Sequence, residues 1–195
     1  MGYRIVYAIL WPILRLCYPC RYIGRERLPE GAVLICANHS NAVDPILIAF
    51  AFGRKKQIHF MAKEELFKNP VFGWLIRSLG AFPVARGKGD TGVIDTAVER
   101  LSSGRSLMIF PEGTRVHEGE SVEAKTGAAL FATRTGTPML PVYIQPKKRI
   151  FRPTTVVIGQ PYFPKTEGRR ATAEELEEIT QDLMNRIRAL GEGLE

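Results

Sequence analysis

Short apolar runs of strand length alternate along this chain with stretches whose apolar residues recur at helical spacing. Residues 32–37 (AVLICA) are uniformly apolar, as expected of a strand buried on both faces. Residues 93–101 instead place their apolar side chains on one helical stripe. Such alternation predicts an α/β fold whose central sheet is largely parallel or mixed and flanked by helices. With 195 residues, the chain is expected to form a single domain around one core.

The same patterns assign the individual elements. Strands are predicted at residues 32–37, 57–61, 82–85, 106–110, 139–144 and 154–158. Helices are predicted at residues 44–52, 71–79, 90–101, 125–134 and 172–190. The first of these helices has Asp44 as its expected cap, followed by Pro45 in the first turn. Thr172 and Glu175 have the spacing of a capping box at the start of the last helix.

Three polar clusters each follow a predicted strand, at residues 38–44, 86–90 and 111–115. Functional loops of α/β sheets lie at the carboxyl ends of the strands. We therefore expect the three clusters to converge on one crevice.

The first cluster contains a candidate acid–base pair. His39 lies in the predicted loop and Asp44 at the start of the next helix, so the two side chains can turn toward each other. An imidazole is suited to removing a hydroxyl proton near neutral pH, and a carboxylate on its far nitrogen fixes the tautomer and stabilises the imidazolium. The pair predicts a general base. The alternative is that each side chain only caps local backbone.

The other two clusters bring cationic side chains and glycine-rich backbone. Arg86 precedes Gly87, Lys88 lies between Gly87 and Gly89, and Arg115 follows Gly113 and Thr114. Guanidinium groups and backbone amides are favoured ligands of phosphate, although each segment could also be a solvated turn. A nucleotide P-loop is excluded, because its spacing of glycines, Lys and Ser or Thr is not met.

The N-terminal segment is amphipathic and basic. Residues 5–14 are uncharged, but as a helix they would reach only about 15 Å, half of a bilayer core. Residues 1–56 contain eight Lys or Arg and three acids, which concentrates positive charge here. As a helix, the segment has an aliphatic side that includes Val6 and an aromatic, arginine-bearing side that includes Tyr7. This predicts an in-plane membrane helix, with the aliphatic side in the acyl boundary and the other side at headgroup level. A helix packed on its own domain shows the same amphipathicity. A secretory signal is disfavoured, because no small-residue cleavage site follows.

Composition and missing motifs argue against other classes. Three cysteines do not make a disulfide framework, and three scattered histidines do not make a metal site. The basic runs at residues 54–56 and 147–149 come with no nucleic-acid motif, so they are expected to be solvated. A serine hydrolase is disfavoured because no Gly-x-Ser-x-Gly is present. A lipid-binding protein without catalysis would not need both His39 and Asp44.

Four segments together resemble the conserved blocks of the glycerolipid acyltransferases, and most of all the 1-acyl-sn-glycerol-3-phosphate acyltransferases. In order, they are residues 38–44 (NHSNAVD), 80–87 (GAFPVARG), 110–115 (FPEGTR) and 137–142 (TPMLPV). The resemblance implies that His39 deprotonates the acceptor hydroxyl and that Asp44 orients it. The resemblance also implies that Pro141 lies on the acyl-donor side. This sequence departs from many members of the family at Asn41, where they have Ser. The residues implied to hold the substrate phosphate are Arg86, Glu112, Gly113, Thr114 and Arg115.

The resemblance also implies an activity and its setting. A fatty acyl group would move from a thioester, acyl-CoA or acyl carrier protein, to the sn-2 hydroxyl of lysophosphatidic acid, giving phosphatidic acid without a covalent intermediate. Glycerol 3-phosphate or another lysophospholipid remains an alternative acceptor. No metal and no cofactor other than the acyl donor is expected, and no nucleic acid. Residues 1–22 would be a membrane-interface helix and residues 23–195 the acyltransferase domain, held peripherally or monotopically at the cytoplasmic face of the membrane.

Overall fold

The computed structural model describes residues 2–84, 91–117, 119–168 and 170–194. Within these residues one sheet of seven strands has the order β1-β7-β6-β2-β5-β3-β4. Neighbouring strands are parallel except β6 and β7, which are antiparallel, so the sheet is mixed. The strands are β1 Cys20–Ile23, β2 Leu34–Ala37, β3 His59–Lys63, β4 Ala81–Val84, β5 Leu107–Ile109, β6 Met139–Ile144 and β7 Thr154–Ile158.

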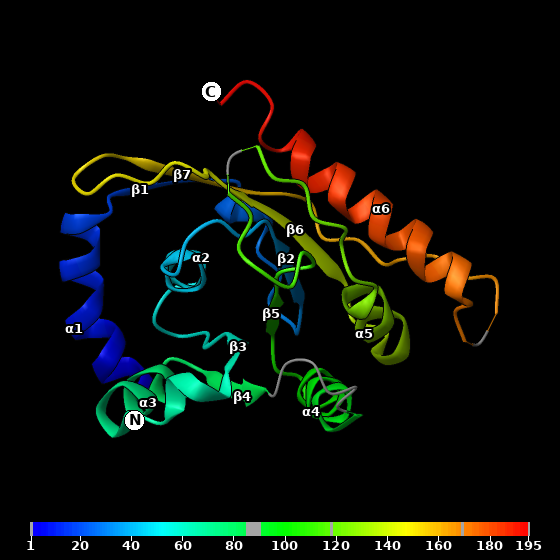
Figure 1. Cartoon of the computed structure of the whole chain (residues 1–195), viewed down its shortest axis with the longest axis horizontal. Coiled ribbons are helices and arrows are strands. Elements are labelled where there is room, and N and C mark those ends of the chain that lie inside the picture. The colour runs from blue at the N-terminus through cyan, green and yellow to red at the C-terminus, as the bar shows by residue number, and fades with distance from the viewer. Residues whose placement is uncertain (1, 85–90, 118, 169, 195) are drawn as a thin grey trace.

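Helices cover both faces of this sheet (Figure 1). The helices are α1 Gly2–Cys17, α2 Asp44–Ala51, α3 Pro70–Ser78, α4 Thr91–Ser102, α5 Gly127–Thr135 and α6 Ala173–Ala189, with short 3₁₀ helices η1 Arg25–Arg27 and η2 Glu64–Phe67. Successive side chains of β2 point to opposite faces. Ile35 joins the core under α1, α2 and α3, whereas Leu34 and Cys36 join the core under α4, α5 and α6. The prediction of an α/β domain with a mixed, helix-flanked sheet is confirmed.

The predicted strands and helices are found in order, with one strand missed. Strands β6 and β7 have the bounds predicted for them. The missed strand, β1, lies at the sheet edge and pairs in parallel with β7. Its sequence CRYI includes the exposed Arg21 and forms no apolar run, because an edge strand is only half covered. The segment predicted as residues 1–22 therefore contains helix α1 and most of β1.

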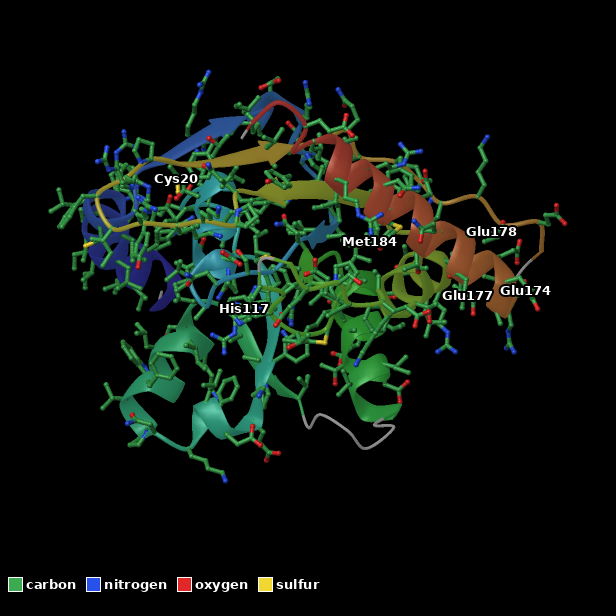
Figure 2. The ribbon with its side chains drawn as sticks, turned by 45° about the horizontal axis from the view of Figure 1, so that its top comes forward. Cys20, His117, Glu174, Glu177, Glu178 and Met184 are labelled. Atoms are coloured by element: carbon green, nitrogen blue, oxygen red, sulfur yellow. The ribbon has the colours of Figure 1, made fainter. Side chains whose placement is uncertain are left out.

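The start of α2 corrects one prediction, and the start of α6 confirms another. Thr172 and Glu175 form the predicted capping box of α6. Asp44 is not the cap of α2: the N-cap is Val43, without a side-chain hydrogen bond, because the Asp44 carboxylate turns back toward the preceding loop. Along α6, Met184 is buried in the core while three carboxylates point to solvent (Figure 2): Glu174, Glu177 and Glu178.

Helix α1 packs on the domain with one side and exposes the other. Val6 and Tyr7 are buried, and the Tyr7 ring meets Phe50 of α2 edge-on with centroids 5.0 Å apart. This corrects the expected orientation, in which Val6 belonged to the membrane side and Tyr7 to the headgroup side. The outer side carries a stripe of aliphatic side chains, each more than half exposed: Ile5, Ile9, Ile13 and Leu16. No helix in the described part of the chain is long and apolar enough to cross a bilayer.

Candidate active site

Two asparagines shape the loop that follows β2. The Asn38 amide nitrogen donates to Ile144 O, and its Oδ1 accepts from Ile144 N, both at 2.8 Å. This side chain thus continues the pairing of β2 with β6 by one residue. Asn41 Oδ1 accepts a hydrogen bond from Val43 N at 3.2 Å. The loop therefore leaves the sheet in a fixed direction, with His39 as its first residue beyond Asn38.

His39 and Asp44 face each other across this loop. His39 Nδ1 lies 3.0 Å from Asp44 Oδ2, and the Asp44 side chain is fully buried. The same Oδ2 accepts hydrogen bonds from the backbone nitrogens of Ser40 at 2.8 Å and Asn41 at 2.7 Å. An Nδ1–H that donates to this carboxylate leaves the lone pair on Nε2. The structure thus brings together the two residues that the sequence paired, in a geometry suited to a base acting through Nε2.

A buried lysine, which the sequence analysis missed, completes the pair. Lys148 Nζ lies 2.7 Å from Asp44 Oδ1, and its side chain is fully buried. The ammonium also donates to Ser40 Oγ at 3.0 Å and to Gln145 O at 2.7 Å. The signal was available, because Lys148 follows the carboxyl end of β6 just as His39 follows that of β2. The expectation that the basic run at residues 147–149 is solvated is therefore wrong for Lys148.

The environment of Asp44 keeps its carboxylate ionised. Burial by itself raises the pKa of Asp44, but the hydrogen bond from His39 and the positive charge of Lys148 outweigh burial. Its pKa therefore lies below the ordinary value. If His39 takes up a proton, the ionised Asp44 carboxylate beside its Nδ1 stabilises the resulting imidazolium.

Glu112 and Phe110 hold His39 from the neighbouring strand end. The buried Glu112 accepts a hydrogen bond from His39 N through Oε2 at 2.8 Å. The Phe110 ring stacks on the imidazole with centroids 4.0 Å apart and planes inclined by 18°. Burial raises the pKa of Glu112 from 4.5 to about 7, with the charge of Asp44 adding to the rise against the hydrogen bond from His39. The Glu112 carboxyl group thus holds the backbone of His39, the candidate base, in place.

Replacing Glu112 by glutamine is expected to change how stability depends on pH. A carboxyl whose pKa is raised in the folded protein stabilises most below its unfolded pKa, and this contribution is lost as the pH rises through about 7. Glutamine keeps an acceptor for His39 N but cannot titrate. The wild type should lose unfolding free energy between about pH 5 and about pH 8, and Glu112→Gln should lose less. Urea denaturation at both pH values measures this, and equal losses would contradict the assignment.

The remaining phosphate-binding candidates occupy the loop after β5. Gly113 has φ 68°, a left-handed conformation in which a side chain would be strained, and a Cβ there would lie 3.1 Å from the Lys125 side chain, so glycine is favoured. Thr114 and Arg115 are exposed. The next residue, Val116, donates its N–H to His39 O at 2.8 Å, which ties this loop to the base.

The structure brings two of the three predicted clusters together, those after β2 and β5. Arg86 and the rest of the cluster at residues 86–90 lie outside the described residues. That cluster follows β4, which is separated from β5 by β3. With strands spaced about 4.8 Å apart, the end of β4 lies about 10 Å across the sheet from the end of β5.

Pro141 lies in β6, behind the ends of the strands. It pairs with Cys36, three residues before His39, which places it about 10 Å back along the sheet. A Cβ on Gly159 would lie 2.9 Å from Pro141 Cγ, so Gly159 allows β7 to approach here. Its predicted place on the acyl-donor side remains a prediction. In the part of the chain that is described, no three His, Cys, Asp or Glu side chains are grouped to hold a metal ion.

Comparison with known proteins assigns this site to a family. The acyltransferase family profile matches residues 20–145, which include the loops of His39, Asp44 and Glu112. The 1-acyl-sn-glycerol-3-phosphate acyltransferase of Bacillus subtilis is 31% identical over 194 residues, which is 96% of each chain. The chain belongs to the acyltransferase family.

Two further relatives bear on what this acyltransferase does. The crystal structure of the 1-acyl-sn-glycerophosphate acyltransferase of Thermotoga maritima superposes with a TM-score of 0.70 at 28% identity, covering 97% of this chain and 77% of that one. The lyso-ornithine lipid O-acyltransferase of Pseudomonas aeruginosa is 35% identical over 141 residues, 69% of this chain and 52% of that protein. The fold of the acyltransferase is thus shared with a solved enzyme, and its family includes more than one acceptor lipid.

Proposed function

We propose that this acyltransferase transfers a fatty acyl group from a thioester donor to the sn-2 hydroxyl of 1-acyl-sn-glycerol 3-phosphate, giving phosphatidic acid in phospholipid biosynthesis. The observation that carries the proposal is the contact of His39 Nδ1 with the buried Asp44 carboxylate at 3.0 Å. It directs Nε2 to act as a base, and relatives named for this reaction match nearly the whole chain.

The proposed reaction proceeds by direct attack on the thioester. His39 Nε2 removes the proton of the acceptor hydroxyl as its oxygen attacks the thioester carbonyl. The tetrahedral intermediate then collapses, its carbon–sulfur bond breaks, and the imidazolium returns the proton to the departing thiolate. Asp44 stabilises the transient imidazolium, while Lys148 keeps Asp44 ionised and in place. No acyl group becomes covalently attached to the protein at any step.

The acceptor phosphate is proposed to bind to the loop after β5, together with Arg86. An exposed guanidinium can bind a phosphate through two hydrogen bonds. Arg115 is exposed and precedes Val116, whose N–H donates to His39 O. Gly113 and Thr114 would add backbone and hydroxyl donors. Glu112 was expected to bind the phosphate, but we propose instead that it positions His39, because its carboxylate accepts the His39 N–H.

Replacing Arg115 by alanine is expected to weaken acceptor binding. A charged hydrogen bond to phosphate contributes about 1.5–3 kcal/mol, so the KM for lysophosphatidic acid should rise by roughly 10- to 100-fold. Because Arg115 does not touch the thioester, the KM for the donor should stay within about twofold of wild type. Initial rates measured against each substrate provide the test. Arg134→Ala, an exposed arginine on α5, is the matched control, and an unchanged acceptor KM in Arg115→Ala would remove Arg115 from the site.

The proposed substrate requires the enzyme to work at a membrane surface. A lysolipid with about fifteen methylenes is held in a bilayer by roughly 12 kcal/mol, so it cannot be drawn into water. Around α1 the structure exposes large apolar side chains from three parts of the chain. We define this docking surface as Ile5, Ile9, Ile13 and Leu16 of α1, Leu66 of η2, Val71, Phe72 and Trp74 of α3, and Ile150 and Phe151 after β6.

Two contacts bring these three parts of the chain next to one another. Helices α1 and α3 lie side by side (Figure 1), and Gly2 of α1 approaches Ser78 of α3. At the other end of α1, Phe151 N donates to Cys17 O at 2.7 Å. Phe151 is two-thirds exposed at φ 63°, a conformation uncommon for a bulky residue. We propose that this surface enters the cytoplasmic leaflet peripherally.

Replacing Ile9 and Ile13 together by glutamine is expected to release the protein from liposomes. Each buried aliphatic side chain contributes about 1.5–3 kcal/mol, so the pair should weaken partition by about 100-fold or more. Both residues are exposed, so the fold should survive, unlike in a deletion of the whole helix, which would remove the buried Val6 and Tyr7. Liposome flotation measures the partition. Full retention of the variant would show that another surface docks.

The acceptor and donor can be tested together. Purified protein in phosphatidylcholine vesicles is given labelled lysophosphatidic acid, glycerol 3-phosphate or lyso-ornithine lipid, each with acyl-CoA or acyl-acyl carrier protein. The proposal predicts the highest kcat/KM for lysophosphatidic acid with one of the two donors. A higher value for either of the other acceptors would overturn the assigned substrate while leaving the family unchanged.

A further inference from the structure

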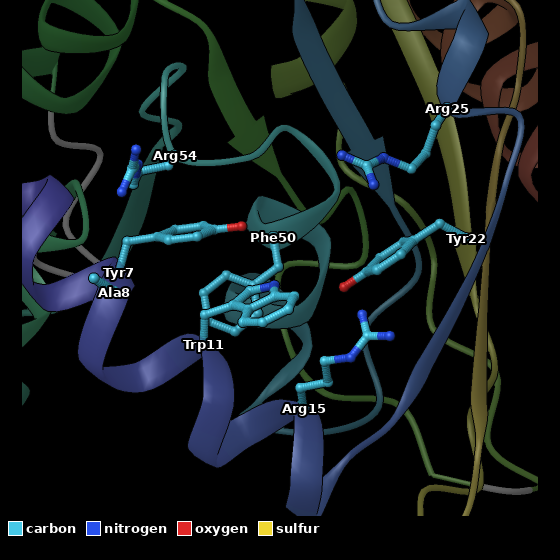
Figure 3. A pocket seen from close by; sticks show the side chains of 8 residues that line it. All are labelled: Tyr7, Ala8, Trp11, Arg15, Tyr22, Arg25, Phe50 and Arg54. Carbon is cyan, nitrogen blue, oxygen red and sulfur yellow. The ribbon is translucent and has the colours of Figure 1, made fainter.

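A cavity lies between the C-terminal part of α1 and the domain (Figure 3). Its α1 residues Tyr7, Trp11 and Arg15 lie on the side of the helix opposite the exposed aliphatic stripe. Its volume is about 410 Å³, within the range of small-molecule sites. None of its described lining residues belongs to the loops of His39, Asp44, Glu112 or Lys148. The lining residues are Tyr7, Ala8, Trp11, Arg15, Tyr22, Arg25, Phe50 and Arg54.

Aromatic side chains fixed by contacts with the domain form the floor of the cavity. Tyr7 packs edge-on against Phe50 of α2. Tyr22 of β1 donates its hydroxyl to Leu47 O of α2 at 2.9 Å. The hydroxyl ends of Tyr7 and Tyr22 point into the cavity from opposite sides (Figure 3). The floor of the cavity is thus formed by apolar aromatic rings, and its polar groups are the hydroxyls of Tyr7 and Tyr22.

Three arginines form the rim, and among the described residues that line the cavity none carries a carboxylate. The Arg15 guanidinium lies over the Trp11 ring at 5.0 Å, and that of Arg25 over the Tyr22 ring at 5.7 Å. In the described ranges, none of the ion pairs involves Arg15, Arg25 or Arg54. Stacking on aromatic rings holds a guanidinium in place while leaving its N–H donors available. The rim is therefore positioned to bind an anion.

The surroundings of the cavity indicate where its anion comes from. The aliphatic stripe of α1 that we assign to the bilayer lies on the same helix as Tyr7, Trp11 and Arg15. On an in-plane helix whose apolar face enters the acyl boundary, aromatic and arginine side chains on the opposite face lie at the depth of the lipid headgroups. Along α2, Phe50 is six residues from Asp44, about 9 Å by helical rise, so the cavity is distinct from the catalytic pair.

We propose that this cavity binds the headgroup of an anionic glycerophospholipid, a lipid that is neither substrate nor product. Its phosphate lies among Arg15, Arg25 and Arg54, and its glycerol packs on Trp11 and Tyr7. The bound lipid fixes α1 against the domain and so orients the catalytic face on the membrane. The proposal goes beyond acyl transfer, and it would hold if the acceptor proved to be another lysolipid.

Binding to vesicles tests the proposal without requiring turnover. Flotation compares phosphatidylcholine vesicles with vesicles that also contain phosphatidylglycerol, which takes no part in the proposed reaction. The double variant Arg15→Gln/Arg25→Gln should lose about tenfold or more of the gain that phosphatidylglycerol gives, since each charged hydrogen bond to the bound phosphate contributes about a factor of ten. The matched control is Arg4→Gln/Arg21→Gln, which removes the same charge from α1 and β1 outside the cavity. The control should keep most of the gain.

A second readout reports on the cavity itself. The chain has two tryptophans, so in a Trp74→Phe background fluorescence reports only Trp11 in the cavity wall. Phosphatidylglycerol vesicles should change this emission in the background protein and in the His39→Ala protein, but not in Arg15→Gln/Arg25→Gln. Equal losses in both double variants would show a diffuse charge effect and overturn the proposal. An arginine-dependent response to free coenzyme A or inorganic phosphate would assign the cavity to a soluble anion and overturn it equally.

Discussion

Replacing His39 by alanine is expected to lower kcat by about 10²- to 10⁴-fold, the usual contribution of a general base. The variant removes the only group that the proposed reaction uses to take the hydroxyl proton. The imidazole is largely enclosed, with 14% of its side chain exposed, and it stacks on Phe110, so some stability is lost as well. Phosphatidic acid formation at saturating acceptor and donor measures the change, with thermal unfolding as the check on folding.

The matched control for this variant is His117→Ala. His117 is an exposed histidine on the loop after β5 (Figure 2), and its backbone N–H rather than its ring hydrogen-bonds Glu120. Its removal should leave kcat within about twofold of wild type. If His39→Ala retains the activity of this control, the role of base passes to another residue and the proposed reaction path is wrong.

Replacing Lys148 by methionine is expected to have the largest effect on stability. Methionine fills much of the same volume but leaves the Asp44 carboxylate buried without its counter-charge. Removing one partner of a buried ion pair lowers unfolding free energy by about 3–5 kcal/mol. With the lysine charge gone, the pKa of Asp44 rises, because that charge helps to hold it low. Urea denaturation gives the stability, with Lys165→Met as an exposed control.

A second variant separates the ion pair from simple packing. In Lys148→Met/Asp44→Asn both charges are removed, so much of the stability lost in Lys148→Met should return. Activity should not return, because asparagine cannot balance the imidazolium charge. If the double variant is as unstable as the single one, the loss arises from the shape of the lysine side chain and not from the buried pair.

The sequence predicted the elements around the site well because their signals are local. Strands β2 and β6 are apolar runs buried on both faces, β7 is a run of β-branched residues, and the start of α6 is defined by a capping box only four residues long. Strand β1 was missed because pairing with β7, far along the chain, makes it a strand. The pairing of His39 with Asp44 was predictable because only five residues separate them.

Other parts of the site depend on contacts that sequence spacing does not encode. Lys148 meets Asp44 from a loop more than one hundred residues later, and Glu112 meets His39 N from the loop after β5. Whether a basic side chain is solvated or buried as an ion pair is decided by which strand ends are neighbours. For α1, amphipathicity could not distinguish packing from membrane contact, and the structure shows a packed inner face beneath an exposed aliphatic stripe.

The central claim is that this chain moves an acyl group from a thioester to lysophosphatidic acid. Its most direct test follows both products of one incubation: the thiol released from a labelled acyl thioester and the labelled lipid formed in vesicles. The account predicts thiol and labelled phosphatidic acid in equal amounts, with the label at sn-2, only when lysophosphatidic acid is present. Thiol release without a lipid product, or no consumption of either thioester donor, would contradict it.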